Sequence, residues 1–228
     1  MTGLIFYLYL LLSFIGLVKN MDTTKESFVL EAGPDTDIWR KPPSKDVWNA
    51  PISRTSSGQL KKFQSARVTF WADWLERYDQ GGLLLALKRV SAPPASPDQS
   101  TEKWIKTGVE FYQGQPMLST VATDRWADWS VGPLGAAVDP AKGVTLEIIR
   151  EGDENGKSAW VYRLLLDEAG NVKEKVPLRE ICWIFADEND KDGEEWLLDV
   201  SPLVARPAKT NPDFLKVNFS EFEVKWSS

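Results

Sequence analysis

Two runs of alternating residues, separated by a Gln-Gly-Gln-Pro break, constrain the fold of this chain more than any other stretch. They lie within residues 104–130, which read WIKTGVEFYQGQPMLSTVATDRWADWS, and the break is at 113–116. Alternation with a period of two residues is typical of a β-strand with two different faces. A break containing Gly and Pro between two such runs is typical of a chain reversal. We therefore predict a β-hairpin here.

The two faces of the first predicted strand differ in character. One face is mainly apolar and carries Ile105, Thr107, Val109 and Phe111. The other face is polar and aromatic and carries Trp104, Lys106, Gly108 and Glu110. Because Gly108 leaves space above the backbone, this second face has the composition expected of a sheet that lines a ligand groove. A solvated face on which Lys106 and Glu110 simply pair across strands has the same composition, so both interpretations stay open.

The rest of the chain consists of short alternating runs with turn residues between them, and no long segment has the 3.6-residue period of a helix. This pattern is typical of a β-sandwich or barrel. We predict strands at residues 27–32, 66–71, 82–88, 143–150, 158–166, 178–185 and 214–226. Of these, 66–71 and 82–88 are expected to be neighbours, and 89–102 is expected to be a surface loop.

Two further features refine this picture. Residues 39–43 and 48–51 contain Pro, which fixes the backbone, so we expect extended segments that cross an edge or end of the sandwich. In the C-terminal run the apolar residues change phase, from Leu215, Val217 and Phe219 to Phe222, Val224 and Trp226. A β-bulge near residues 220–221 would return both sets to one buried face.

Composition excludes several classes of function. The chain of 228 residues has no His, which excludes the Ser-His-Asp triad and the usual zinc ligand sets. The net charge of -6, without a basic run, argues against a nucleic-acid partner. Cys182 stands alone, so the chain has no internal disulfide, and its apolar neighbours predict an inert thiol in the core. We expect no cofactor.

The first 20 residues differ from the remainder. Residues 3–18 are almost entirely apolar and are compatible with a signal or a membrane anchor, although no basic residue precedes them and the run is shorter than the ~20 residues that span a bilayer. Translation from Met21 is the interpretation we favour, because every strand signal follows it. We therefore predict an N-terminal segment at 1–20, a single domain at 21–228 and a cytoplasmic protein. A secreted or membrane-anchored protein is the alternative.

Several segments, taken together, resemble a known family. They are residues 37–43, 78–83, 104–110, 118–123, 128–130, 149–152 and 219–222. In this order the chain resembles the regulation-of-enolase, concanavalin A-like family, a domain of unknown function in fungal and bacterial β-sandwich proteins. The resemblance implies an all-β fold with two packed antiparallel sheets in a jelly roll, an architecture that hosts both sugar-binding and sugar-cleaving proteins.

A candidate ligand site follows from the predicted pairing of residues 82–88 with 104–111. Gln80 then shares a face with Lys106 and Glu110, Trp104 flanks them, and Arg150 on another strand could complete the group. Amide, ammonium, carboxylate and guanidinium groups beside an aromatic ring suit a neutral polyhydroxyl ligand. We therefore predict that these five residues bind carbohydrate.

Catalysis has weaker support than binding. Glu110 is the candidate acid, but glycoside hydrolysis usually needs a second carboxylate, and the nearest candidate, Glu147, alternates with apolar residues. The E-x-D-x-x-E arrangement of related glucanase folds is absent. We expect a non-catalytic protein that recognises carbohydrate or serves the regulation of intracellular sugar metabolism. A glycoside hydrolase or lyase using Glu110 and a protein-interaction module are the alternatives.

A loop near the C-terminus partly imitates a calcium site. Its oxygen donors are Glu188, Asp190, Asp192 and Asp199. The loop begins with Glu rather than Asp, ends with Asp rather than the longer Glu, and lacks flanking helices, which departs from the EF-hand pattern. A solvated acidic loop without a metal is the interpretation we favour.

Overall fold

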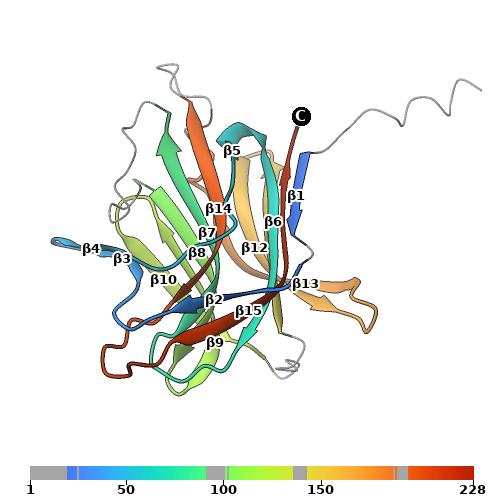
Figure 1. Cartoon of the computed structure of the whole chain (residues 1–228). Helices are drawn as coiled ribbons and strands as arrows, with labels where there is room; N and C mark the ends of the chain where they lie inside the picture. The colour runs from blue at the N-terminus through green and yellow to red at the C-terminus, as the bar shows by residue number, and fades with distance from the viewer. Residues whose placement is uncertain are drawn as a thin grey trace, which may run out of the picture.

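The fold was obtained as a computed structural model, which describes residues 20–24, 26–90, 101, 103–135, 143–186, 188 and 195–228. These residues form two large antiparallel β-sheets, a small two-stranded sheet and a short 3-10 turn at Leu60–Lys62. The two large sheets face each other across one buried core (Figure 1). The predicted all-β, concanavalin A-like jelly-roll sandwich is therefore confirmed.

The first large sheet contains seven strands. Its order is β1 (Asn20–Thr24), β15 (Leu215–Trp226), β6 (Phe63–Ala72), β11 (Val144–Asp153), β12 (Gly156–Leu166) and β13 (Val172–Ile181), and β2 (Phe28–Ala32) also pairs with β15. The two ends of the described chain therefore meet in one sheet.

The second large sheet contains six strands. Its order is β10 (Ala127–Pro133), β9 (Gln115–Thr123), β8 (Lys103–Tyr112), β7 (Gln80–Arg89), β14 (Trp196–Ala205) and β5 (Ser56–Gln59). Inward residues such as Leu83 and Leu85 of β7 and Ile105 of β8 belong to one buried cluster with Val68 and Phe70 of β6. Because side chains alternate along a strand, the intervening residues of β7 and β8 point to the outer face of this sheet.

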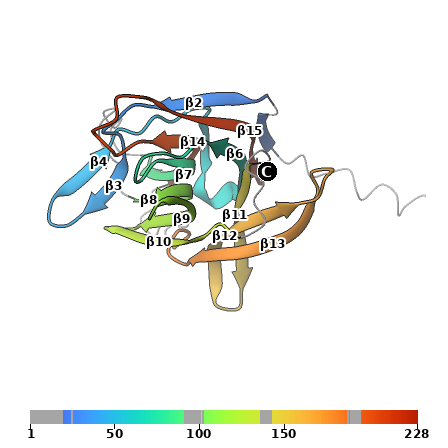
Figure 2. The same ribbon diagram turned by 90° about the horizontal axis from the view of Figure 1, so that it is seen from below.

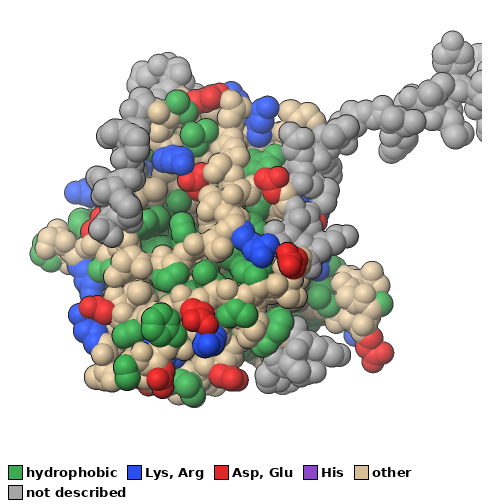
Figure 3. Space-filling model, viewed as in Figure 1, with side chains coloured by type: hydrophobic (Ala, Val, Ile, Leu, Met, Phe, Trp, Pro, Cys, Tyr) green, Lys and Arg blue, Asp and Glu red, His purple; other side chains and the backbone are tan. Residues whose placement is uncertain are grey.

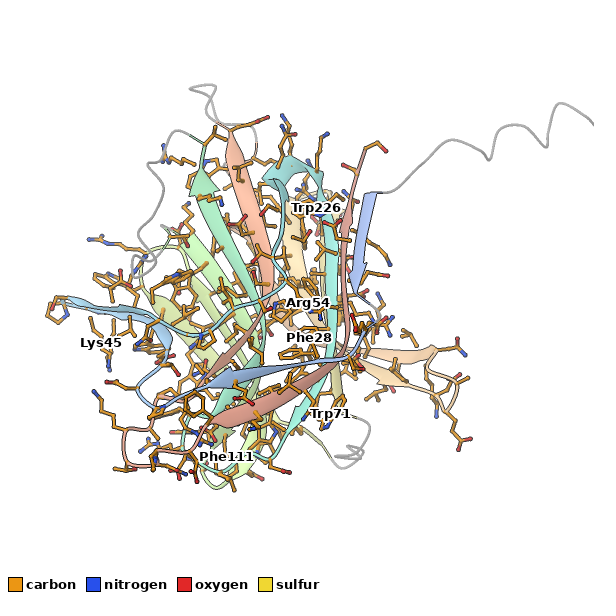
Figure 4. The ribbon with its side chains drawn as sticks, viewed as in Figure 1. Phe28, Lys45, Arg54, Trp71, Phe111 and Trp226 are labelled. Atoms are coloured by element: carbon orange, nitrogen blue, oxygen red, sulfur yellow. The ribbon has the colours of Figure 1, made fainter. Side chains whose placement is uncertain are left out.

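A third layer covers part of that outer face. Strands β3 (Ile38–Lys41) and β4 (Lys45–Trp48) form a hairpin, and Figure 2 shows the six-stranded sheet lying between this hairpin and strands β6 and β11. Lys45, at the tip, extends away from the sandwich (Figure 4). At its base Ile38 joins a second buried cluster on the sheet, with Leu84, Trp104, Val121 and Leu203.

Two local predictions are confirmed. The turn between β8 and β9 is made by Gln113 and Gly114, both with positive φ (52° and 78°), and β10 follows as a third strand. In β15 the pairing with β6 shifts between Phe219 and Glu221, so the strand has the expected bulge. As a result, Phe219 and Phe222 both lie in the core.

Other predictions need correction. Residues 66–71 and 82–88 are not neighbours, because β6 and β7 belong to different sheets. Residues 39–41 belong to β3 and pair with residues 45–47 of β4, whereas of residues 48–51 only Trp48 belongs to β4, and Pro51 accepts a bond from Val204 of β14. Most of the predicted loop at 89–102 lies outside the described residues.

The strand predicted at 178–185 ends earlier than expected. β13 stops at Ile181 and the chain then turns, so Ile184 and Phe185 face the core and Cys182 is exposed. The prediction of a core thiol is therefore wrong, because periodicity in an apolar run assumes that the strand continues.

Candidate functional site

Three of the predicted site residues lie together on the outer face of the six-stranded sheet. Gln80 of β7 is opposite Glu110 of β8 in the strand register, and Lys106 lies four residues before Glu110 on β8, on the same face. The Lys106 Nζ atom donates a hydrogen bond to Gln80 Oε1 at 2.7 Å. All three side chains are buried, with Lys106 and Glu110 each 6% exposed. Burial of a cation and a carboxylate is costly unless they have partners, so this cluster is not an ordinary solvated sheet face.

Asp37 connects this cluster to the β3–β4 hairpin. It precedes β3 directly, and its Oδ1 atom accepts hydrogen bonds from Lys106 Nζ at 3.0 Å and from Gln80 Nε2 at 3.3 Å. The backbone N–H of Ile38 donates to the same oxygen at 2.8 Å. Sequence reasoning about the sheet missed Asp37, although it begins one of the segments that carry the family resemblance. The ion pair therefore holds the hairpin on the sheet.

Glu110 lies at the other side of the cluster. Its Oε2 atom accepts a hydrogen bond from the Ser119 hydroxyl of β9 at 2.8 Å, and Ser119 Oγ accepts one from Trp129 Nε1 of β10 at 3.0 Å. Burial raises the pKa of the Glu110 carboxyl. The charge of Lys106, the hydrogen bond from Ser119 and the nearby N–H of Trp129 oppose this rise, and the negative charge of Asp37 adds to it. The carboxyl is thus a buried acid whose charge is only partly compensated.

Four half-buried rings surround the cluster, and we call Trp39, Tyr78, Tyr112 and Trp129 the aromatic rim. Tyr112 and Tyr78 are stacked at 5.8 Å between ring centroids, and Trp129 meets Tyr112 edge-on at 5.1 Å. Trp39 meets Trp129 edge-on at 6.4 Å. Arg77 lies over the Tyr78 ring at 4.6 Å. The rim therefore joins residues of the hairpin, the loop before β7 and the strands β8 and β10.

Gly82 and Gly108 form a cross-strand pair in the floor of the site. A Cβ atom on Gly108 would lie 2.0 Å from the carbonyl oxygen of Gly81, and one on Gly82 would lie 2.2 Å from that of Thr107. The two glycines are therefore required by the close approach of β7 and β8. The cavity beside them, lined also by Glu110, has a volume of only about 10 Å³, roughly the space that one water molecule needs. A larger ligand would contact the aromatic rim from outside.

Trp104 does not have the expected position. The prediction placed it as an open surface beside the cluster, but its side chain is fully buried. It packs beneath the hairpin, with its ring 6.3 Å from that of Trp48 in an edge-on contact. The prediction is wrong because the pattern of one strand does not reveal a separate hairpin that covers it.

Arg150 does not join the cluster either. It lies on β11 in the seven-stranded sheet, where its guanidinium donates to the carbonyl oxygens of Leu60 at 2.7 Å and Phe63 at 2.8 Å and to Glu188 at 2.5 Å. Arg150 does lie on the same face of its strand as Leu146 and Ile148, as the alternation predicted. The alternation does not say to which sheet that strand belongs. Glu147, the candidate second carboxylate for Glu110, lies on the same strand in that other sheet.

Two of the four predicted metal ligands, Glu188 and Asp199, lie in the described part of the chain, and both are bonded to other side chains. Glu188 accepts bonds from Arg150 and Lys157, both at 2.5 Å. Despite burial, these bonds and cationic charges hold its pKa below the usual range. Asp199 of β14 accepts bonds from Lys88 and Ser57, each at 2.6 Å.

Two members of that metal set, Asp190 and Asp192, lie outside the described residues. Within the described ranges, no group of three or more acidic or Cys side chains is placed to hold a metal ion. Nor does this part of the chain contain a helix long and apolar enough to cross a membrane.

The face of the molecule seen in Figure 3 carries mixed charge. Lys, Arg, Asp and Glu side chains are interspersed on the face seen in Figure 3, and apolar side chains lie among them. The visible face therefore presents no continuous field of one charge, in keeping with the absence of a basic run in the sequence.

The fold defines this chain as a concanavalin A-like β-sandwich protein. It belongs to the family described as "protein of unknown function (DUF1349)", which it matches over residues 18–164. The uncharacterized protein AN7484 of Emericella nidulans is 40% identical over 208 residues, covering 91% of this chain and 90% of that protein. The family membership thus leaves the function open.

Solved structures share the fold. A functionally unknown protein from Saccharomyces cerevisiae superposes with a TM-score of 0.54 at 20% identity, covering 92% of this chain and 97% of that one. A mutant of the GH43 protein BlXynB from Bacillus licheniformis superposes with a TM-score of 0.50 at 15% identity, covering 87% of this chain. This chain spans only 33% of that protein. At these identities the likeness shows a common architecture and nothing about activity.

Proposed function

We propose that this protein is a non-catalytic carbohydrate-recognition protein whose ligand lies against the aromatic rim. The observation that carries the proposal is the convergence of four half-buried rings on one buried polar cluster at the outer face of the six-stranded sheet. A sugar presents C–H faces, which pack on rings, and hydroxyl groups, which need hydrogen-bond partners. The rings supply the first kind of contact, and the buried polar cluster lies behind them.

Each part of the site has a role in this proposal. In this proposal Trp129 and Tyr112 supply the aromatic surface against which a sugar ring packs, since both rings are half-buried and in contact with each other. Gln80, Lys106 and Glu110 form the polar floor beneath them, and Asp37 holds the floor in place. Of the five residues expected from the sequence, these three stay in the proposed site.

A glycan array followed by calorimetric titration of the sugars that bind tests the proposal. Trp129→Ala should weaken binding at least tenfold, about 1.4 kcal/mol, because a central aromatic contact is lost. Trp160→Ala is the matched control, since Trp160 is also half-buried but lies on β12 of the other sheet. Failure to bind any sugar, or equal binding by the Trp129 variant, would contradict the proposal.

A glycoside hydrolase or lyase using Glu110 is the second candidate. The raised pKa of Glu110 and the neighbouring carboxylate of Asp37 favour it, because such reactions use two carboxyl groups in different states. Two observations favour binding without catalysis. Asp37 is already engaged by Lys106 and Gln80, and the cavity is too small for a sugar to lie between the two carboxyl groups. In an enzyme, Glu110→Gln would keep sugar affinity and abolish turnover.

We further infer a cytoplasmic protein that serves the regulation of intracellular sugar metabolism, with residues 21–228 as its domain. The lone Cys182 and the polar start at Met21 support this inference. A chain beginning at Met21 keeps nearly all of β1 and should melt at the temperature of the full chain. Aggregation of that shorter chain, or a secreted or membrane-bound full chain in cell fractionation, would argue against it. A protein-interaction module is the remaining alternative, indicated if no sugar binds.

A further inference from the structure

A hydrogen-bonded relay crosses three strands beneath the aromatic rim. Trp129 of β10 donates from Nε1 to Ser119 Oγ of β9 at 3.0 Å, and Ser119 donates its hydroxyl proton to Glu110 Oε2 of β8 at 2.8 Å. A serine hydroxyl has one proton, so the relay has a direction that ends on an acceptor at Glu110. The half-buried indole at one end is therefore linked to the buried carboxyl at the other.

The relay depends on the charge of Glu110. A carboxylate accepts a charge-assisted hydrogen bond that is roughly twice as strong as a neutral one, whereas a protonated carboxyl is a poorer acceptor and becomes a donor. When Glu110 is protonated, its carboxyl can donate to Ser119 Oγ. The serine hydroxyl then points its own proton away from Glu110, and the geometry of the oxygen that accepts from Trp129 Nε1 changes. The change at Glu110 therefore reaches the indole through one hydroxyl group, across hydrogen bonds of 2.8 and 3.0 Å.

Few charges surround this carboxyl. Of the charged groups in the described part of the chain, Lys106 of β8 and Asp37 before β3 act most strongly on Glu110. Its neighbours Gln80 of β7, Ser119 of β9 and Trp129 of β10 are neutral. Lys106 is directed to Asp37 and Gln80, with bonds of 3.0 and 2.7 Å. The ionisation of Glu110 is thus the change in charge that acts most directly on the relay.

We propose that the aromatic rim contains a pH-sensitive switch, in which the ionisation of Glu110 sets, through Ser119, the hydrogen bonding and orientation of the Trp129 indole. Burial of Glu110 moves its pKa upward, towards neutral pH. The consequence for ligand binding, that sugar affinity changes with pH in the range where Glu110 titrates, rests on the proposed function. The relay itself does not, so it can be tested without a sugar.

The test follows the indole N–H resonances of the ¹⁵N-labelled full chain as pH is varied. The Trp129 signal, assigned by its loss in Trp129→Phe, should shift in one titration step above the ordinary range of Glu. Glu110→Gln should remove the step, and Ser119→Ala should remove or strongly reduce it. Glu147→Gln is the control, since Glu147 is also buried but pairs with Lys175 in the other sheet, and it should leave the step unchanged.

Three results would overturn the switch. The first is a Trp129 signal that does not titrate, and the second is a step that survives Glu110→Gln, which would assign it to another group such as Asp37. The third is a step of full size in Ser119→Ala, which would show that the serine does not transmit it. None of these results depends on carbohydrate. A protein that binds no sugar but titrates as expected would reject the proposed function and keep the switch.

Discussion

Glu110 and Glu188 are two buried carboxylates with opposite electrostatic surroundings. The Glu188 side chain is 6% exposed and contacts two cations, Arg150 and Lys157, each at 2.5 Å. Glu110 is buried as a whole residue, more deeply than Glu188, and it accepts its bond from the neutral hydroxyl of Ser119. The pKa of Glu188 is consequently lowered and that of Glu110 is raised.

The difference separates a structural charge from a candidate functional one. Two cations compensate the charge of Glu188, and its contacts fasten the loop after β13 to β11 and β12. The charge of Glu110 is kept buried without an equal compensation, which costs stability. Groups of this kind are concentrated at functional sites. Four predictions, in order of decreasing effect, test the comparison.

The largest effect is expected for Arg150→Met. The change removes a partner from the Glu188 side chain and takes one of two donors from each of the carbonyls of Leu60 and Phe63. We expect the free energy of unfolding to fall by about 3–5 kcal/mol in urea denaturation. Lys157→Met is the control, since Lys157 is 54% exposed, and it should cost less than about 1 kcal/mol. Equal effects of the two changes would remove the structural role assigned to Arg150.

A smaller loss is expected for Glu188→Gln. At neutral pH the amide offers one acceptor oxygen where the carboxylate offers two, so one of the two bonds from Arg150 and Lys157 is lost, and we expect a loss of about 1.5–3 kcal/mol. Because the folded-state pKa of Glu188 is lowered, its contribution is present above the ordinary pKa of Glu and is lost as pH falls through the folded value. The gap between variant and wild type should therefore close in acid. A stability difference between Glu188→Gln and wild type that is constant with pH would contradict the lowered pKa of Glu188.

Glu110→Gln should have the opposite sign. Since the folded-state pKa is raised, the cost of the charge is present above that value and absent below the ordinary pKa of Glu. The neutral amide still accepts from Ser119, so the variant should equal the wild type or gain up to about 1 kcal/mol at neutral pH. The gain in the free energy of unfolding should vanish when the denaturation is repeated at acid pH. A clear loss at neutral pH would show that Glu110 is a structural charge like Glu188.

No effect is expected from calcium chelation. Glu188 is engaged by Arg150 and Lys157, and Asp199 by Lys88, so neither is free to bind an ion. A bound ion at a hundredfold excess over its Kd would add about 2.7 kcal/mol to stability. The melting temperature should therefore be the same in calcium and in chelator. A calcium-dependent rise of that size would return this loop to the candidate metal sites.

Local sequence patterns predicted the fold well. The hairpin at 104–130 and the bulge near 220–221 depend on alternation and turn residues within one segment, so the sequence contains them. The meeting of Gln80, Lys106 and Glu110 was also predictable, because it needs only two neighbouring strands and a common phase.

The rest of the site depends on topology, which local patterns do not contain. Asp37 and Trp39 come from a hairpin that folds back over the sheet, and Trp129 comes from the edge strand β10. The same hairpin buries Trp104. Arg150 was predicted to join the cluster, but its strand belongs to the other sheet. Alternation fixes the face of a strand on which a residue lies and leaves the order of the strands open.

The contrast between the two carboxylates can be measured directly by following the side-chain carboxyl ¹³C resonances of the full chain as pH is varied, with Glu110→Gln and Glu188→Gln used for assignment. The structure predicts that Glu110 titrates above the ordinary range of Glu and that Glu188 titrates below it. Coincident titration of the two carboxyls, or the reverse order, would contradict the assignment of Glu110 to the functional site and of Glu188 to the framework.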